Sequence, residues 1–217
     1  TMIHSRSANS KHLMEISHAN PIWIHPDEAQ RHGIEDASLV RIETEIGHFV
    51  NRVWVTDGLC PGVLACSHHM GRWKLDTGPG SRWGSATVRF EDLPSGQIRL
   101  RLLEGVVPFK SKDPDSSRSW WSEAGVHQNL AFPVQTDPVS GMHCWHQKVR
   151  LVKADSEDRY GDVVVDPAKS RQVHLRWKEL TRPASPQQHG GLRRPRELPR
   201  PLGRSPEAYL FEQNRGQ

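Results

Sequence analysis

The 217-residue chain lacks the features of a membrane-spanning protein, of a disulfide-stabilised scaffold and of a four-iron cluster protein. No apolar run approaches the roughly 18 residues of a membrane span, and the first residues contain no hydrophobic signal core. The three cysteines, Cys60, Cys66 and Cys144, show no small-scaffold spacing and are too few to ligate a four-iron cluster. We therefore expect no disulfide framework and no direct membrane insertion of this chain.

A basic surface that could bind nucleic acid is also lacking in most of the chain. The formal net charge is +4, but residues 179–217 contain seven Arg, no Lys, four Glu and no Asp, which is +3. Residues 1–178 therefore carry only +1, by the difference of the two sums. A nucleic-acid groove needs its basic excess on the folded part, so we expect no nucleic-acid partner.

Apolar residues are scarce, at 35% of the chain, and the mean hydropathy is −0.68, which indicates that some part does not pack into a core. The carboxy-terminal part has the composition expected of such an unpacked segment. The strand pattern decays after Lys153, and six prolines lie among residues 183–206. We expect residues 156–217 to form an extended Pro/Arg-rich arm.

The rest of the chain is rich in short β-type segments separated by turn residues. Pro26–His32 is the exception, because Pro and two acidic residues begin it and Gly33 follows it, which predicts a short helix. Many short strands with almost no helical periodicity favour a β-barrel or a sandwich. We predict strands at residues 21–24, 38–44, 48–55, 63–66, 86–90, 97–103 and 148–152. The alternating segments 38–44 and 48–55 form a hairpin pattern, and a turn at residues 93–96 separates the strands at 86–90 and 97–103.

A group of metal-ligand residue types raises the alternative of a zinc-stabilised domain. His143, Cys144 and His146 lie within four positions, and His68 and His69 lie upstream. A structural zinc site usually shows Cys-x₂₋₄-Cys or His-x₃₋₅-His pairs. Adjacent residues on a strand point to opposite faces, so each adjacent pair offers at most one ligand to one centre. We therefore assign no metal ligand, and interpret Cys66 and Cys144 as small buried residues.

Five segments, in order, resemble a known family. They are His4–Asn9, Asn20–Ala29 followed by Gly33–Asp36, Leu39–Ile42 with Gly47 and Pro61–Val63, Gly125–Asn129, and Asp137–Gly141 followed by Lys148–Arg150. Together they are similar to the carboxy-terminal molybdopterin-dinucleotide-binding domain of molybdenum and tungsten oxidoreductases of the dimethyl-sulfoxide-reductase superfamily. One turn departs from the family pattern, because Asp36-Ala37 stands where Asp-Gly is usual and cannot use glycine's access to positive φ.

The resemblance implies the fold and the domain organisation. It implies a mainly β fold, a six-stranded double-psi β-barrel with short helices and an extended carboxy-terminal arm. The barrel domain would span residues 1–155 and the arm residues 156–217. A Trp-rich insertion at about residues 72–122 would lie within the barrel domain, either as a lid over the site or as a contact with the rest of the enzyme.

The resemblance also implies a cofactor, molybdopterin guanine dinucleotide with Mo or W. Arg6 and Ser7 suit the pyrophosphate, because Arg forks and hydroxyls bind phosphate oxygens. Asn, Gln and neutral His suit the pterin edge, because each can donate and accept hydrogen bonds. Each residue also has an ordinary structural interpretation, such as a turn, a helix cap or a solvated surface position. The predicted cofactor-binding residues are His4, Arg6, Ser7, Asn9, His68, His69, Gly125, Asn129, Gln147 and Lys148.

The implied function is to hold one pterin dinucleotide next to a metal centre supplied with other domains. We assign no catalytic residue and expect the chain alone to be inactive, as a carboxy-terminal domain of a larger oxidoreductase. Its partners would be an iron–sulfur electron-transfer subunit together with the remaining catalytic domains or subunit of the enzyme. An iron–sulfur cluster is expected only in the remainder of the enzyme. The enzyme would be located in the prokaryotic cytoplasm or periplasm. The alternatives are a double-psi barrel used as a non-catalytic binding or assembly module, and the zinc-stabilised domain.

Overall fold

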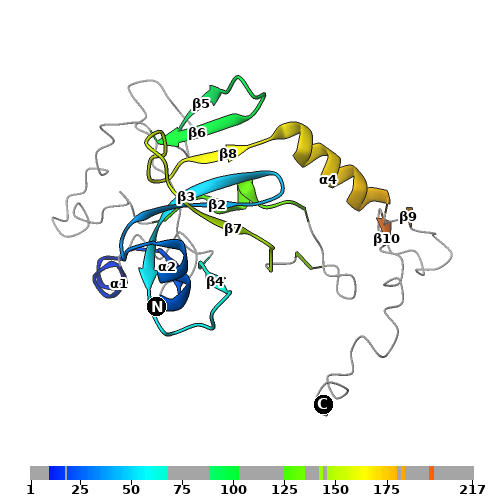
Figure 1. Cartoon of the computed structure of the whole chain (residues 1–217). Helices are drawn as coiled ribbons and strands as arrows, with labels where there is room; N and C mark the ends of the chain where they lie inside the picture. The colour runs from blue at the N-terminus through cyan, green and yellow to red at the C-terminus, as the bar shows by residue number, and fades with distance from the viewer. Residues whose placement is uncertain are drawn as a thin grey trace, which may run out of the picture. The chain divides into compact units, whose positions relative to one another are not determined.

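The computed structural model describes residues 10–17, 19–67, 88–102, 125–134, 142–143, 146–179, 182–183 and 196–197. The chain divides into two compact units: Thr1–Phe132 with Lys148–Pro167, here called the sheet unit, and Pro133–Gln147 with Ala168–Gln217. The helices of the described residues (Figure 1) are α1 Lys11–Ile16, α2 Pro26–His32, the 3₁₀ helix η2 Gln128–Ala131 and α4 Pro167–Glu179. The strands are β1 Ile22–Ile24, β2 Leu39–Glu43, β3 Gly47–Val55, β4 Leu64–Ala65, β5 Val88–Asp92, β6 Ile98–Leu102, β7 Arg150–Lys153, β8 Val163–Val165, β9 Arg182–Pro183 and β10 Arg196–Glu197.

One eight-stranded sheet dominates the sheet unit. Its main path runs β4-β1-β3-β8-β6-β5, and β2 pairs with β3 and with β7 off this path. The β1–β3 pair is parallel, with Ile22 opposite Val53, whereas the other pairs of this sheet are antiparallel. Figure 1 shows β2, β3 and β7 running side by side through the middle of the unit. The nine-residue strand β3 therefore organises the sheet, because β1, β2 and β8 all pair with it.

The β2–β3 hairpin forms where the alternating sequence predicted it. Val40 and Ile42 are buried while Leu39, Arg41 and Glu43 between them are only partly covered, which is the period of two of a half-buried strand. On β3, Gly47 faces β8 so closely that a Cβ atom there would lie 2.0 Å from the Val164 carbonyl oxygen. Glycine therefore permits the close approach of β3 and β8.

The hairpin within the predicted insertion joins the same sheet. β5 and β6 pair antiparallel across the turn at residues 93–96, as the sequence predicted, and β6 then pairs with β8. The strand β8 and the helix α4 were not predicted, because both lie in residues 156–217, where we expected an extended arm. The three consecutive valines of β8 are nearly all buried, so their strand is a continuous apolar run without alternation.

The predicted helix at Pro26–His32 is confirmed as α2. The His25 side chain accepts a hydrogen bond from the Asp27 backbone N–H, and Gly33 ends the helix in the left-handed conformation at φ 60°. Four residues later the Asp36-Ala37 turn also needs positive φ, and Ala37 adopts φ 61° although it carries a Cβ atom. The turn thus uses the conformation that we expected alanine to prevent. Its Ala37 N–H donates to the Val53 carbonyl and its carbonyl accepts from Arg52 Nη1, at 3.1 and 2.9 Å.

The core of the sheet unit joins the inner face of the sheet to α2 and η2. Phe49, on β3, is 1% exposed and its ring meets that of Phe132 edge to face at 5.9 Å. Val126 and Ala131, which flank or end η2, belong to the same core. The prediction of a mainly β fold with short helices is confirmed. The strand pairings of the described residues form an open sheet, so closure into a six-stranded barrel stays a prediction.

The second unit contributes a long helix and a short strand pair to the described residues. α4 spans thirteen residues, and His174 stacks on Trp177 with ring centroids 6.2 Å apart. β9 pairs antiparallel with β10. Among the described residues of both units, no helix has the length and apolar character needed to cross a lipid bilayer.

Candidate functional site

The candidate site starts from the segment Gly125–Phe132, which contains the predicted residues Gly125 and Asn129. Gly125 and Val126 are buried, and the side chain of Asn129 is on the exposed side of η2. Two contacts fix the segment, because Phe132 packs on Phe49 and the Thr44 hydroxyl donates to the Ala131 carbonyl. The Gln128 side chain is buried. The apolar anchors hold η2 to the core, so Asn129 projects from a rigid short element.

A single backbone carbonyl connects this segment to the predicted His68–His69 loop. Gln128 Nε2 donates to the Ser67 carbonyl oxygen at 3.1 Å, and Asn20 Nδ2 donates to the same oxygen at 2.5 Å. The Asn20 carbonyl in turn accepts from Asn51 Nδ2 at 2.9 Å. Asn20, Asn51 and Gln128 are buried. Segments 47 and 61 positions away in sequence therefore meet at Ser67, which precedes His68, and Asn51 holds Asn20 in turn.

Lys148 lies in the same unit, two positions before β7. Its side chain is exposed, and β7 begins with Arg150 opposite Glu43 of β2. The next residue of the chain after Glu43 is Thr44, which bonds to Ala131 of η2. The beginning of β7 and the end of η2 thus lie at the same end of β2. The structure therefore connects the Gly125–Asn129 segment, through Gln128, to Ser67, which precedes His68, and places the Lys148 segment at the same end of β2 as the end of η2.

The remaining predicted residues are placed differently. Gln147 belongs to the second unit, where it is partly buried. Six predicted residues fall outside the described residues, so their positions stay predictions; they are His4, Arg6, Ser7, Asn9, His68 and His69.

Burial shifts the pKa of two groups near Ser67. The surrounding chain lowers the pKa of His127, which favours a neutral imidazole that can both donate and accept. Burial raises the pKa of the Cys66 thiol to about 12, so Cys66 is a neutral thiol at physiological pH. Cys66 is partly buried and packs against the apolar core. The described residues contain no group of three His, Cys, Asp or Glu side chains arranged to hold a metal ion.

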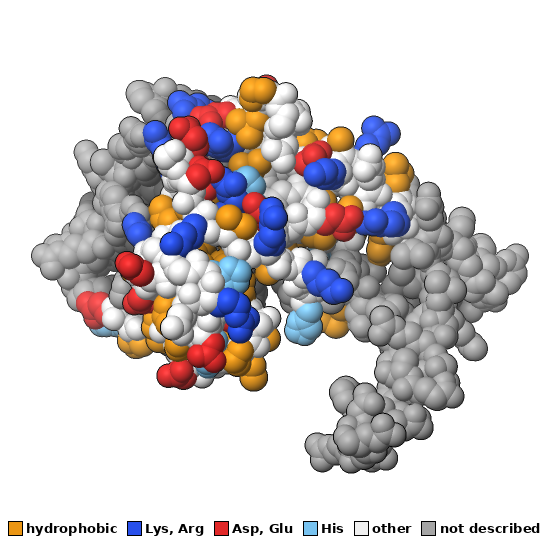
Figure 2. All heavy atoms as spheres, in the orientation of Figure 1, with side chains coloured by type: hydrophobic (Ala, Val, Ile, Leu, Met, Phe, Trp, Pro, Cys, Tyr) orange, Lys and Arg blue, Asp and Glu red, His pale blue; other side chains and the backbone are white. Residues whose placement is uncertain are grey.

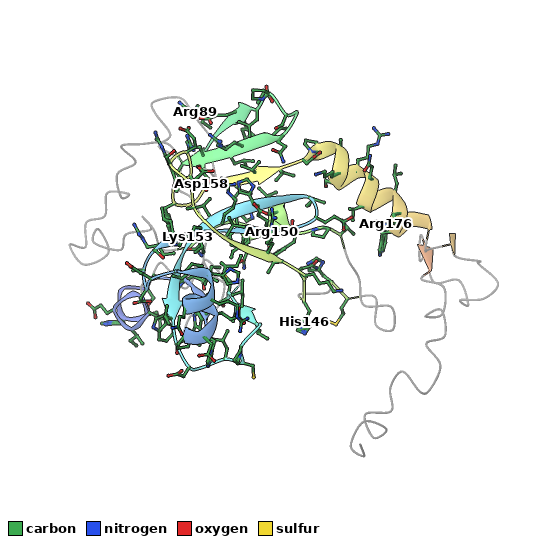
Figure 3. All side chains as sticks on the ribbon, in the orientation of Figure 1. Arg89, His146, Arg150, Lys153, Asp158 and Arg176 are labelled. Atoms are coloured by element: carbon green, nitrogen blue, oxygen red, sulfur yellow. The ribbon has the colours of Figure 1, made fainter. Side chains whose placement is uncertain are left out.

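The outer face of the sheet carries charged side chains that are paired with one another. Figure 2 shows basic and acidic side chains interspersed over one face, and Figure 3 shows Arg150 on β7 and Asp158 in the loop before β8. Arg41 contacts Asp155 at 2.5 Å and Asp158 at 2.8 Å, and Arg150 pairs with Glu43. These arginines serve the fold, because carboxylates of the same unit already neutralise them.

Three buried amides of this site were not predicted from the sequence: Asn20, Asn51 and Gln128. Asn20 begins one of the segments that carries the family resemblance, but we used it there only as part of a pattern. Asn51 interrupts the apolar alternation of β3 at a core-facing position, between Phe49 and Val53, and this interruption was the available signal. Gln128 gave no signal in sequence, because its role depends on a contact 61 positions away.

A protein-family model for the molydopterin dinucleotide binding domain matches residues 1–148 of the chain. This match covers more than half of the chain. The chain belongs to the molydopterin dinucleotide binding domain family. The family resemblance carried by the five segments is confirmed, and the same match supports the predicted cofactor, molybdopterin guanine dinucleotide.

Two curated relatives share part of this molydopterin dinucleotide binding domain. One is a Halobacterium salinarum protein, named for the catalytic subunit of dimethyl sulfoxide reductase, which is 38% identical over 74 residues, or 34% of this chain. The other is a tetrathionate reductase subunit of Salmonella typhimurium, which is 26% identical over 131 residues, or 60% of this chain. The matched regions span only 9% and 13% of the relatives' lengths. No solved structure gives a significant match.

The described residues fit a pterin dinucleotide by their hydrogen-bonding chemistry. Gln128 Oε1 is buried and has no hydrogen-bond donor in the described part of the chain, so it is an acceptor in need of a donor. His127 favours the neutral form, and Asn129 exposes an amide with both donor and acceptor atoms. A pterin and a guanine both present mixed donors and acceptors. The residues around Ser67 therefore offer the polar groups that such a ligand needs.

Proposed function

We propose that this chain is the domain of a larger molybdopterin oxidoreductase that holds one pterin guanine dinucleotide beside the Mo or W centre. When bound, the cofactor supplies the redox chemistry, while the domain supplies binding, orientation and electrostatics. The family match supports the cofactor, and the small share of each relative that the chain covers supports a larger enzyme. The remaining catalytic domains and an electron-transfer subunit would be its partners.

The observation that carries this proposal is the junction at the Ser67 carbonyl. Two buried amide side chains, from Asn20 and Gln128, hold the residue that precedes the His68–His69 loop next to the segment with Asn129. Buried polar groups persist where their hydrogen bonds fix a specific geometry. Ser67, held in this way, needs little reordering when the ligand arrives, and preorganisation raises affinity.

In this proposal each predicted residue of the sheet unit has one task. Arg6 and Ser7 contact the pyrophosphate, and Gly125 lets the backbone come close to the ligand. The pterin edge meets the amides and neutral imidazoles of the sheet unit, namely Asn9, His68, His69 and Asn129. His4 and Lys148 complete the rim. The sheet would close as the six-stranded double-psi barrel that the resemblance implies. The parallel β1–β3 pair within an otherwise antiparallel sheet supports this topology.

The test is to replace Asn129 by alanine in the full-length protein and to measure bound pterin by mass spectrometry together with the melting temperature. Loss of the exposed amide leaves a ligand edge unpaired, which costs about 1–3 kcal/mol, or one to two decades of affinity. The melting temperature of the cofactor-free protein should stay unchanged because Asn129 is exposed. The control is Leu130→Ala, which alters the neighbouring exposed side chain of η2.

Three outcomes separate the alternatives. Cofactor lost from Asn129→Ala but kept by Leu130→Ala supports the proposed site. Full retention in both variants refutes this placement of the cofactor. A full-length protein that carries no pterin in any form would instead support a double-psi barrel used as a binding module.

A further inference from the structure

The Gln128 side chain has one amide atom that is bonded and one that is not. Its Nε2 donates to the Ser67 carbonyl at 3.1 Å. Its Oε1 is buried, and no donor among the described residues lies within hydrogen-bond distance. Gln128 as a whole is only 6% exposed, so this oxygen is an inner acceptor and not a surface atom. An unpaired buried acceptor carries the full cost of its desolvation, so folded proteins rarely retain one without a use.

The location of this acceptor connects it to the predicted cofactor loops. Gln128 lies between Val126 and Ala131, which are both core residues. A rotation of η2 that moved the Gln128 side chain would therefore also pull core residues out of their packing. The bond to Ser67 fixes the amide plane from the other side. Nε2 already donates to the Ser67 carbonyl, so Oε1 is the atom of this amide that can still accept a hydrogen bond.

We propose that Gln128 positions the cofactor by coupling these loops: Nε2 fixes the Ser67 carbonyl, and Oε1 accepts a hydrogen bond from an N–H group of the bound ligand. This inference rests on the proposed function. The chemical group that it requires is an aminopyrimidinone edge, which has N–H donors next to a carbonyl. Both the pterin and the guanine of the dinucleotide have this edge, so either end of the ligand can supply the donor.

The decisive variant is Gln128→Met in the full-length protein. Methionine keeps the length and burial of the side chain but removes the donor and the acceptor. Removal of the unpaired oxygen offsets part of the lost Ser67 bond, so the melting temperature of the cofactor-free protein should change little. Cofactor affinity should fall about tenfold or more, since the ligand loses a hydrogen bond and the Ser67 carbonyl loses one of the donors that hold it. Gln30→Met is the matched control, because Gln30 is an exposed residue of α2.

Two probes distinguish the source of the donor. Retained pterin is measured after gel filtration, and binding of guanosine monophosphate to the cofactor-free protein is measured by calorimetry. Weaker guanosine monophosphate binding in Gln128→Met assigns the donor to the guanine. Lost pterin with unchanged guanosine monophosphate binding assigns the donor to the pterin.

Retention of pterin and binding of guanosine monophosphate at wild-type levels in Gln128→Met would overturn the inference while leaving the proposed function intact. Absence of pterin from the wild-type protein and from Gln30→Met would overturn the proposed function itself. Should Gln128→Met fail to fold, Gln128→Asn keeps the amide but is one methylene too short to bridge. The same loss of cofactor is expected from it, and wild-type retention would again overturn the inference.

Discussion

Gly33 and Ala37 adopt nearly the same left-handed backbone conformation, at φ 60° and φ 61°, on either side of a three-residue stretch. Glycine reaches this conformation freely, whereas an L-residue with a Cβ atom pays roughly 1–2 kcal/mol. The chain therefore uses the suitable residue at the first position and a strained one at the second. Hydrogen bonds of Ala37 to Val53 and Arg52 hold the strained turn in place.

Replacement of Ala37 by glycine should raise the free energy of unfolding by about 1 kcal/mol, because relief of strain exceeds the added entropy of the unfolded chain. Chemical denaturation measures this change. The matched control is Gly33→Ala, which places a Cβ atom at positive φ and 3.4 Å from Lys153 Nζ, and should destabilise. An Ala37→Gly variant that is less stable than the wild type would contradict the explanation.

Arg101 and Asp162 form a buried ion pair that joins β6 to the start of β8. Arg101 Nη2 lies 2.6 Å from Asp162 Oδ2, and the two side chains are 9% and 2% exposed. Asp162→Ala leaves a buried guanidinium without its partner, which should cost about 3–5 kcal/mol of unfolding free energy. Arg101→Met combined with Asp162→Ala should cost less than the sum of the single variants.

The control for this pair is Asp155→Ala, because Asp155 is a 54% exposed partner of Arg41 and exposed pairs contribute only about 0–1 kcal/mol. Similar destabilisation by Asp155→Ala and Asp162→Ala, measured by denaturation, would show that burial is not what makes the Arg101–Asp162 pair important.

His48 should make the stability of the sheet unit depend on pH. Burial, with a smaller contribution from the Arg41 cation, lowers the pKa of His48 from 6.5, although Asp158 and Glu43 oppose the shift. Below pH 6.5, His48 is protonated in the unfolded chain while it is still neutral in the folded chain. The free energy of unfolding therefore falls as the pH is lowered through 6.5. It levels off below the folded-state pKa.

The measurement is the free energy of unfolding of the wild type and of His48→Gln between about pH 7.5 and about pH 5. Glutamine does not titrate, so the variant should lose part of the decrease. Some decrease should remain, because burial also lowers the pKa of His127. Identical pH profiles for the two proteins would argue against this assignment.

Arg6 gives the remaining prediction about the cofactor, and it comes from the family resemblance alone. A charge-assisted contact to phosphate contributes about 1.5–3 kcal/mol, so Arg6→Ala in the full-length protein should lose one to two decades of cofactor affinity. Bound cofactor per protein after dilution measures this loss. Arg6→Lys keeps the charge but not the bidentate fork, and should lose less. Unchanged retention in Arg6→Ala would remove Arg6 from the site.

The sequence by itself determined the local elements and the family. Gly33 after Pro26–His32 predicted the end of α2, and the alternation in residues 38–44 and 48–55 predicted the β2–β3 hairpin, because helix caps and half-buried strands depend on nearby residues. Five ordered segments were enough to identify the molybdopterin-dinucleotide-binding domain, since each keeps residue types that can be compared without a structure.

Only the tertiary structure decided which distant segments meet. Val163–Val165 gave no alternating pattern, because β8 is a central strand that pairs with β3 and β6, and Val163 and Val164, which point to opposite faces of the sheet, are both buried. The unpaired amide oxygen of Gln128 and its bond to Ser67 depend on a contact across 61 positions, and no local periodicity encodes such a contact. Local propensities act over a few residues, whereas hydrogen-bond satisfaction in a buried site is decided by packing of the whole unit.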